Sequence, residues 1–349
     1  MARTLSSEEL KQMLPEKDGK RNGTKRKASS SCYSPAPRRQ HAAFQSIAVC
    51  ADDLIVRDAS SGEQKHCFEH DRMVTCVTYS PDGRYIASGD NAKKLIVRDA
   101  SSGEQKHCFE HGGSVWSVAY SPDGRYIASG DGAKRVIVRD ASSGEQKHCF
   151  EHDARVVCVA FSPNGRYIAS GDWANKLIVR DASSGEQKHC FEHGSGAYSG
   201  AYRLAYVDGR YIEHGGSVCS VEYSPDGRYI ASGDSAKKLI VRDVSSGEQK
   251  HCFEHSGRVC SVAYSPDGRY IASGDGANKL VVRDASSGEQ KHCFEHGGRV
   301  WSVAYSPNGR YIASGDDAKR VIVRDASSGE QKHCFKHDFR VDAVAFSPR

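Results

Sequence analysis

A run of fifteen residues, Val56 to His70, recurs almost unchanged seven times and constrains the fold more than any other feature of the chain. The copies differ in sequence only at Val244 and Lys336. Consecutive copies lie 41 residues apart except for one gap of 62, as shown by the repeated aspartates Asp58, Asp99, Asp140, Asp181, Asp243, Asp284 and Asp325. Because a unit of this length cannot bury both of its faces alone, a fixed period of about 20 to 50 residues indicates packed structural repeats.

One copy of the unit, beginning at His111, reads as four short strands separated by turns. Pro122 and Gly124 suit a tight turn, because proline presets φ and glycine can adopt a positive φ. The apolar run at 136–138 lacks polar alternation, as in strands that are covered on both faces. Four antiparallel strands per unit predict an all-β fold, a β-propeller of four-stranded antiparallel blades. The expected strands are Val115 to Ser121, Tyr126 to Gly130, Arg135 to Asp140 and Gln146 to Glu151.

The two ends of the repeat array are complementary. Residues 44–70 supply the last three strands of a unit, whereas residues 340–347 supply only a first strand. Together they complete one blade, which closes the ring and removes exposed sheet edges. The irregular gap contains residues 197–212, a unit that lacks its outer half. We therefore expect seven blades with a spare inner hairpin over residues 44–349, or alternatively eight blades with one truncated.

The segment Tyr120 to Gly130 reads Tyr-Ser-Pro-Asp-Gly-Arg-Tyr-Ile-Ala-Ser-Gly and is repeated along the chain. With this repetition the chain resembles the WD-repeat β-propeller family over residues 44–349. Two positions depart from the family pattern. The family's Gly-His is Glu110-His111 here, and its Trp-Asp is Arg139-Asp140.

The resemblance implies a structural hydrogen-bond network of His, Ser or Thr, Asp and Trp in each blade. His111 and Ser129 carry over, whereas Ala133 stands at the position of the turn aspartate and Arg139 replaces the tryptophan. We expect Asp131, just before the turn, to pair with Arg139, because an arginine between blades would otherwise be a partly buried charge without a partner. The equivalent aspartates of the other regular blades are Asp90, Asp172, Asp234, Asp275 and Asp316.

The formal net charge of +5 is unevenly distributed along the chain. Residues 1–43 contain ten Lys or Arg and four Asp or Glu, whereas the remainder contains 39 basic and 40 acidic residues. This first segment is poor in apolar residues, which predicts a disordered basic tail. Its densest basic run is typical of a nuclear-localisation signal or a loose polyanion contact, although such runs are also commonly only solvated. The run contains Lys20, Arg21, Lys25, Arg26 and Lys27.

The sequence offers no specific catalytic or metal-binding motif. The spacing of His148, Cys149 and His152 suggests zinc, but four residues of extended chain separate the two histidines by about 13 Å, and the cysteine projects to the opposite face. A Ser, His and Asp repeated in each blade is better explained by fold maintenance than by seven hydrolase centres. We therefore expect no metal, no cofactor, no small-molecule substrate and no enzymatic activity.

Cysteine usage and hydropathy indicate the compartment. Seven of the 13 cysteines occupy one repeat position, an odd set that cannot be paired off, so we expect reduced, half-buried thiols. The chain has no stretch of eighteen apolar residues, and its beginning lacks the apolar segment of a secretory signal. These features predict an intracellular protein, cytoplasmic or nuclear, without membrane association.

Differences among the repeats are concentrated at three positions. They are the residues after the repeat His, the residue after the following Val, and the first residue after Gly-Asp. All three tryptophans of the chain occur there, and the family layout implies that these loops meet at one end of the ring. Because Trp and Arg are enriched at interface hot spots, these positions are candidate binding residues. The set comprises Arg72, Thr75, Asn91, Trp116, Arg155, Val157, Trp173, Arg258, Arg299, Trp301, Asp317, Phe339, Arg340 and Asp342.

Two explanations fit these differences: diversification for binding, or neutral drift in loops after recent duplication. Drift should also alter the exposed Ala-Ser-Ser-Gly-Glu turn, and because that turn is nearly constant we favour a binding face. The sequence thus predicts a non-enzymatic scaffold that binds a protein or peptide through its variable loops. The alternative is a nucleic-acid or chromatin-associated protein that makes its contact through the basic tail.

Overall fold

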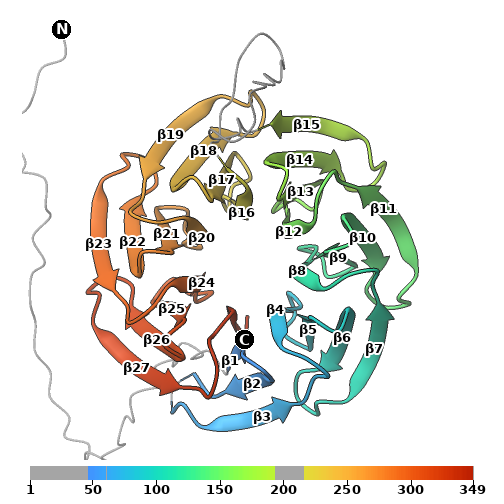
Figure 1. The fold of residues 1–349 in the computed structure, drawn as a ribbon, viewed down its shortest axis with the longest axis horizontal. Coiled ribbons are helices and arrows are strands. Elements are labelled where there is room, and N and C mark those ends of the chain that lie inside the picture. Colours follow the sequence, from blue (N-terminus) through green and yellow to red (C-terminus); the bar gives the residue numbers. More distant parts are fainter. Residues whose placement is uncertain (1–45, 60, 193–215, 349) are drawn as a thin grey trace, which may run out of the picture. The chain divides into compact units, whose positions relative to one another are not determined.

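In the computed structural model, the described residues 46–59, 61–192 and 216–348 form a ring of seven blades, viewed along its axis in Figure 1. Each blade is a sheet of four antiparallel strands, so the expected all-β propeller is confirmed. The inner hairpin expected at 197–212 lies outside the described residues. So does the basic tail, with Lys20, Arg21, Lys25, Arg26 and Lys27.

The strands follow one another from the centre of the ring outward, except that blade 1 takes its innermost strand from the C-terminal end. Blade 1 contains β28 (Ala343–Phe346), β1 (Ile47–Cys50), β2 (Leu54–Arg57) and β3 (Gln64–Phe68). Blade 2 contains β4 (Val74–Tyr79), β5 (Tyr85–Asp90), β6 (Lys94–Asp99) and β7 (Gln105–Glu110), and blade 3 contains β8 (Val115–Tyr120), β9 (Tyr126–Asp131), β10 (Arg135–Asp140) and β11 (Gln146–Glu151). Blade 4 contains β12 (Val156–Phe161), β13 (Tyr167–Asp172), β14 (Lys176–Asp181) and β15 (Gln187–Glu192), and blade 5 contains β16 (Val218–Tyr223), β17 (Tyr229–Asp234), β18 (Lys238–Asp243) and β19 (Gln249–Glu254). Blade 6 contains β20 (Val259–Tyr264), β21 (Tyr270–Asp275), β22 (Lys279–Asp284) and β23 (Gln290–Glu295), and blade 7 contains β24 (Val300–Tyr305), β25 (Tyr311–Asp316), β26 (Arg320–Asp325) and β27 (Gln331–Lys336).

The two ends of the array pair within blade 1. β1 is antiparallel to β28, with Ala48 opposite Ala345, and also to β2, where Ala48 lies opposite Val56. This pairing closes the ring, as the sequence predicted. β12 of blade 4 packs against β16 of blade 5 just as β4 packs against β8. No further blade separates these two, so the eight-bladed alternative is wrong.

Turn residues set the ends of the strands. In blade 3 the observed strands match the expected ones to within one residue. Gly124 adopts a φ of 73°, which a glycine tolerates without steric cost. The next turn places a lysine in the same left-handed region, because Lys134 has a φ of 69°. The equivalent residues with positive φ are Lys93, Asn175, Lys237, Asn278 and Lys319.

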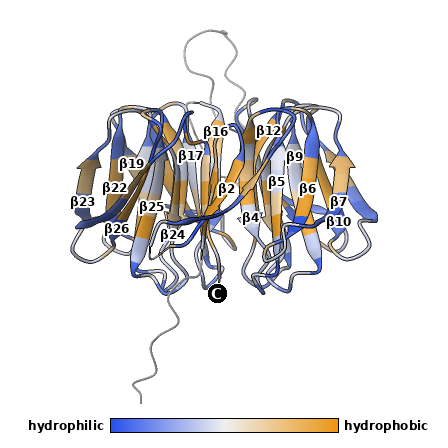
Figure 2. Cartoon of the chain, turned by 90° about the horizontal axis from the view of Figure 1, so that it is seen from below, coloured by the Kyte–Doolittle hydropathy of each residue, from blue (hydrophilic) through white to orange (hydrophobic). Residues whose placement is uncertain are grey.

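The hydrophobic core lies between neighbouring blades. Leu95 and Val97 of blade 2 pack against Val115, Val118 and Ile127 of blade 3, and a similar cluster fills each of the other interfaces. The apolar run at 136–138 is buried along its whole length, as expected for a strand covered on both sides. Figure 2 shows the ring from its edge, with apolar residues along the strands and hydrophilic residues in the loops at both ends.

The repeat cysteine lies on the outermost strand of each blade. Six of these thiols are exposed and one is partly exposed, so the expectation of half-buried thiols is wrong. The physical reason is that no further strand covers this edge of the blade. All the described cysteines are free thiols, and the exposed ones are Cys67, Cys108, Cys149, Cys252, Cys293 and Cys334.

No membrane-spanning helix is found among the described residues, since none of them forms a helix of sufficient length and apolarity to cross a bilayer.

Candidate functional site

A buried network of histidine, aspartate and serine joins the loops at one end of blades 2, 3, 4, 6 and 7. In blade 3, His111 Nδ1 lies 3.4 Å from Asp131 Oδ2, and His111 Nε2 lies 3.4 Å from the hydroxyl oxygen of Ser129. Asp131 Oδ1 also accepts the backbone N–H of Arg135 at 2.9 Å. The network therefore ties the loop before the inner strand to the turn between the second and third strands. The equivalent histidines with both contacts are His70, His152, His255 and His296.

Arg135 adds an ion pair to this network in blade 3. Its Nε and Nη2 donate to Asp131 Oδ2 at 3.3 and 3.1 Å. Burial alone raises the pKa of the Asp131 carboxyl group, but the hydrogen bonds from His111 and Arg135 outweigh burial and lower that pKa below its usual value. Arg320 binds Asp316 in the same way in blade 7. The sequence could have indicated these ion pairs, because Arg135 and Arg320 stand at the start of the third strand where most other blades have lysine.

The ion pair expected between Asp131 and Arg139 is wrong. Arg139 Nη1 instead donates to the carbonyl of Gly144 at 3.2 Å, and its guanidinium carbon lies 4.6 Å from the ring centroid of Phe109 in blade 2. β9 and β10 are antiparallel and place Arg139 opposite Ile127. Asp131 lies four residues further along that strand, about 13 Å away. An aromatic ring and a carbonyl oxygen thus serve as the partners of this guanidinium.

The structure brings two of the three variable positions together at this end of the blades. The backbone N–H of Trp173 donates to the carbonyl of Arg155 at 3.1 Å, and that of Asp317 donates to the carbonyl of Arg299 at 3.0 Å. Each bond joins the turn after Gly-Asp to the loop before the inner strand. We call these loops, with the second residue of each inner strand, the variable loop face. The same bond joins Asn91 to Met73, Gly132 to Ser114, Ser235 to Ser217, and Gly276 to Arg258.

Trp301 on β24 joins three blades on this face. Arg258 of blade 6 and Arg340 of blade 1 place their guanidinium carbons 4.5 and 5.2 Å from centroids of its indole rings. The indole N–H donates to the Asp317 carboxylate, which also lies 3.7 Å from Nε of Arg299. Trp301 is therefore held on several sides, and the cluster links blades 6, 7 and 1.

Two aromatic side chains project into solvent on the same face. Trp173 is 50% exposed and Phe339 is 49% exposed, and they are the exposed large apolar side chains of the described chain. The guanidinium carbon of Arg155 lies 4.0 Å from a ring centroid of Trp173, and Nζ of Lys319 lies 6.0 Å from that of Phe339. Exposed rings beside cations offer both apolar area and charge to a partner.

The other predicted positions, apart from Arg72, are more enclosed. Thr75 donates its hydroxyl to carbonyls of its own blade and of the next, and the carbonyl of Asn91 accepts the hydroxyl of Ser114 at 3.4 Å. Arg340 Nε lies 3.0 Å from the carboxylate of Asp342, whose pKa is nevertheless raised because the group is buried. Trp116 and Val157 are half-buried, and Arg72 is exposed.

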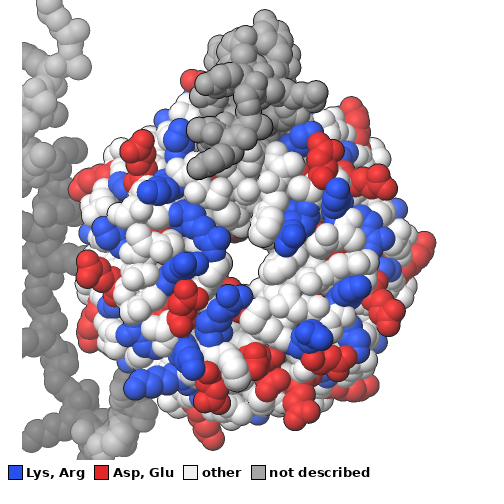
Figure 3. Space-filling view, in the orientation of Figure 1, with Lys and Arg blue, Asp and Glu red and all other residues white. Residues whose placement is uncertain are grey.

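Positive charge exceeds negative charge among the predicted residues. The set contains five arginines and two aspartates, and both aspartates are paired with arginines. Figure 3 shows lysine and arginine side chains around the opening of the central channel. Such uncompensated charge favours partners with carboxylate or other electron-rich groups. The arginines without a carboxylate partner among the described residues are Arg72, Arg155 and Arg258.

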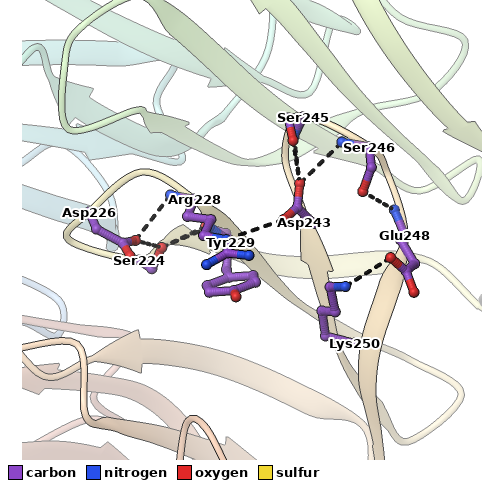
Figure 4. A network of polar contacts seen from close by, with 9 residues as sticks. All are labelled: Ser224, Asp226, Arg228, Tyr229, Asp243, Ser245, Ser246, Glu248 and Lys250. Carbon is purple, nitrogen blue, oxygen red and sulfur yellow. Dashed lines mark hydrogen bonds and ion pairs between the residues drawn. The ribbon is translucent and has the colours of Figure 1, made fainter.

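The constant Ser-Ser-Gly turn lies at the opposite end of each blade and is held by its own hydrogen bonds, drawn for blade 5 in Figure 4. Asp243 Oδ1 accepts the N–H groups of Ser245 and Ser246 at 3.0 and 3.1 Å, and the hydroxyl of Ser245 at 2.6 Å. The hydroxyl of Ser246 accepts the N–H of Glu248 at 3.3 Å. The constancy of this turn has a structural cause, so it does not distinguish diversification for binding from neutral drift.

The zinc-like spacing does not assemble a metal centre. His148 stacks on Phe150 with ring centroids 5.4 Å apart, whereas His152 contacts Asp172 and Ser170. The two histidines therefore face different partners. Within the part of the chain that the structure describes, no three His, Cys, Asp or Glu side chains form a group that could hold a metal ion.

Comparison with known families agrees with this geometry. The sequence model of the family described as WD domain, G-beta repeat matches six segments that together cover more than half of the chain. The matched residues are 62–99, 103–140, 144–181, 208–243, 247–282 and 288–325. No curated protein matches the chain. On the matched repeats and the seven four-stranded blades, this chain belongs to the WD-repeat family.

Proposed function

We propose that this protein is a non-enzymatic scaffold that binds a protein or peptide partner on the variable loop face. WD-repeat propellers are generally protein-interaction scaffolds. The observation that carries the choice of face is the pair formed by Trp173 and Arg155, an exposed indole with a guanidinium 4.0 Å from it.

The chemistry of this face suits a polypeptide. Covering a half-exposed indole contributes favourably to the free energy of binding. Arginine supplies directional hydrogen-bond donors to carboxylate or carbonyl groups. Trp173 and Arg155 lie on loops joined by a backbone hydrogen bond, so the backbone of this site is already ordered before a partner binds. Phe339 and the cluster around Trp301 extend the face over other blades. We place the protein inside the cell, in the cytoplasm or the nucleus, from its reduced thiols.

The test is affinity capture of partners on the immobilised protein. The double variant Trp173→Ala, Arg155→Ala should weaken partner binding roughly tenfold or more, which is the effect of losing an interface hot spot. Arg125→Ala is the matched control, because it also removes an arginine that contacts an aromatic ring. The guanidinium carbon of Arg125 lies 5.5 Å from the ring centroid of Tyr126, in a Ser-Pro turn at the other end of the blade.

Thermal melting of each variant establishes that it is folded. If the double variant keeps every partner at wild-type affinity, the proposed face is wrong. If Arg125→Ala loses the partners instead, the contact lies at the opposite end of the ring. The tail-led nucleic-acid alternative stays a prediction, and binding that disappears when residues 1–43 are deleted would favour it.

A further inference from the structure

A cavity of about 460 Å³ opens between blades 5 and 6, at the end of the ring that carries the Ser-Pro turns. Val241 forms part of its apolar wall, and Tyr229 of blade 5 and Tyr264 of blade 6 line it with aromatic rings. Asp226 and Asp267, one from each blade, line it with carboxylates. The cavity is separate from the variable loop face, so it requires its own explanation.

The hydroxyl group of Tyr264 is available to a ligand. Its side chain is only 7% exposed, it lines the cavity, and no described residue hydrogen-bonds its hydroxyl. Among the described residues, the equivalent hydroxyls of Tyr223 and Tyr305 are buried without a partner, whereas that of Tyr79 contacts the hydroxyl of Ser46 at 3.1 Å. The Tyr264 hydroxyl is therefore free to exchange a hydrogen bond with a ligand in the cavity.

The two aspartates retain acceptor capacity. In Figure 4, Asp226 Oδ1 accepts the hydroxyl of Ser224 at 2.5 Å and the backbone N–H of Arg228 at 3.0 Å. Asp267 Oδ1 takes the equivalent two bonds in blade 6. Since these bonds all end on Oδ1, each carboxylate keeps its second oxygen for a donor in the cavity.

Two cations beside the cavity, Lys250 and Arg228, are already paired. Lys250 Nζ lies 2.8 Å from the carboxylate of Glu248, and Arg228 Nε lies 3.4 Å from that of Asp243. The guanidinium carbon of Arg228 also lies 5.1 Å from the ring centroid of Tyr229, which shows that this ring accepts a guanidinium on one side. The unpaired charge that faces the cavity is therefore negative.

The electrostatic surroundings of Tyr264 agree with this balance. Its pKa is raised by burial and, beyond that, by the negative charges of Asp226 and Glu222. Glu222 is the acidic residue that replaces the alanine found at this inner-strand position in most blades. A cation near the Tyr264 hydroxyl would thus be attracted by the carboxylates of the two turns, Asp226 and Asp267.

We propose that the cavity between blades 5 and 6 binds the guanidinium group of an arginine side chain carried by a partner peptide. A guanidinium presents five donors in one plane, which suits acceptors placed on two opposing turns, and its face stacks on aromatic rings. Asp226 and Asp267 accept its N–H groups, the hydroxyl of Tyr264 accepts another, and the ring of Tyr229 packs against its stem. The proposal does not rest on the variable loop face.

The same lining recurs where the sequence repeats it. The cavity between blades 2 and 3, about 730 Å³, is lined by Tyr85, Tyr120, Asp82 and Asp123 at the equivalent positions. Between blades 4 and 5 the corresponding turn carries Asn164 instead of an aspartate. The cavities between blades 2 and 3 and between blades 5 and 6 thus each carry two aspartates, whereas one aspartate is replaced by an uncharged asparagine between blades 4 and 5.

Fluorine NMR of the full chain labelled with fluorotyrosine tests the proposal. The Tyr264 resonance is identified as the one missing from the variant Tyr264→Phe. The tripeptide Ac-Gly-Arg-Gly-NH2 should shift this resonance saturably, and the citrulline peptide Ac-Gly-Cit-Gly-NH2, which lacks the charge, should bind at least about fivefold more weakly. Asp226→Asn should weaken binding of the arginine peptide by a similar factor of about five.

Asp226→Asn preserves the turn, because Asn164 already makes the same bonds in blade 4. Its Oδ1 accepts the hydroxyl of Ser162 at 2.7 Å and the N–H of Arg166 at 3.0 Å. The proposal is overturned if the arginine peptide produces no saturable shift up to about 20 mM, the range of weak binding. It is equally overturned if citrulline binds as well as arginine, or if Asp226→Asn leaves the affinity unchanged.

Discussion

Arg139 of blade 3 holds its guanidinium carbon 4.6 Å from the ring centroid of Phe109 in blade 2. The same contact crosses all seven interfaces between neighbouring blades, at distances from 4.4 to 5.6 Å. Each phenylalanine also stacks on the histidine two residues before it, as Phe109 does on His107. A stack of arginine, phenylalanine and histidine therefore joins each blade to the next, at the strand position where the WD-repeat pattern has tryptophan.

This contact should show as a coupling energy between Arg139 and Phe109. A double-mutant cycle with Arg139→Ala and Phe109→Leu, measured by urea unfolding, should give a coupling of about 0.5–1 kcal/mol, the range of a partly exposed cation–π contact. Phe150 lies in another interface, where it contacts Arg180. The cycle of Arg139→Ala with Phe150→Leu should therefore give a coupling near zero, and equal couplings in the two cycles would contradict the contact.

The buried histidine of blade 1 should respond to pH differently from its counterparts. His337 is 9% exposed, and neither of its ring nitrogens has a hydrogen-bond partner among the described residues, because Val49 and Ala51 stand where other blades have serine and aspartate. Burial, followed by the charge of Arg57, lowers its pKa to about 4. Between this pKa and the ordinary value of about 6.5, the unfolded chain binds a proton that the folded chain does not. Stability should therefore fall as the pH drops through that window.

His337→Leu should remove this contribution. We expect a smaller loss of the free energy of unfolding between pH 6.5 and pH 4, and an unchanged or slightly higher value at pH 7, because an unsatisfied polar group is lost. The matched variant His296→Leu breaks contacts with Asp316 and Ser314 and should cost about 3 kcal/mol. Urea unfolding at several pH values checks both, and similar losses at pH 7 would contradict the difference.

The outer turns should make the protein sensitive to acid. Hydrogen bonds from the hydroxyl of Ser327 and the backbone of Ser328 lower the pKa of Asp325 to about 2. Because the folded pKa lies below the unfolded value of about 3.9, the stabilisation is present above pH 4 and is lost as the pH falls toward 2. Ser327→Ala and Asp325→Asn should each lower the free energy of unfolding at pH 7 by roughly 0.5–1.5 kcal/mol. Both variants should show a smaller decrease of the free energy of unfolding between pH 4 and pH 2. If that decrease is unchanged, this turn does not cause the sensitivity to acid.

Two glycines of blade 3 should tolerate alanine very differently. Gly144 has a φ of +75°, and a Cβ there would lie 2.8 Å from Cε1 of Phe109. Gly144→Ala should destabilise the fold by about 2 kcal/mol or more, through the left-handed backbone and the crowded ring. Gly132 has no positive φ, and its Cβ would lie 3.4 Å from Nε1 of Trp116. Gly132→Ala should therefore change the melting temperature little, and a comparable fall in both variants would refute the explanation.

Local contacts were predictable from the chain and distant ones were not. The second strand of blade 3 was expected at Tyr126 to Gly130 and is observed at Tyr126–Asp131, because turn residues mark both of its ends. The partner of Asp131 could also have been inferred, since an antiparallel hairpin brings Arg135 back beside it. Phe109, in contrast, lies thirty residues before Arg139 on a strand that only the ring brings alongside.

The candidate binding face shows the same division. Repeat differences identified Trp173 and Trp301 together, but the folded chain separates them. Trp173 is half exposed, whereas Trp301 is enclosed by Arg258, Arg340 and Asp317 from neighbouring loops. Burial depends on residues from other blades, so it could not be inferred from one repeat.

The sequence by itself determined the strand pattern and the closure of the ring, because turn chemistry and complementary ends are local or additive properties of the chain. The contact between β12 and β16 decided between seven and eight blades. The tertiary structure decided which groups satisfy each buried polar side chain. Arg139 contacts Phe109, and His337 has no hydrogen-bond partner within the described part of the chain. Carboxylates from two turns line one cavity. Each of these outcomes depends on atoms that only the packing of neighbouring blades brings together.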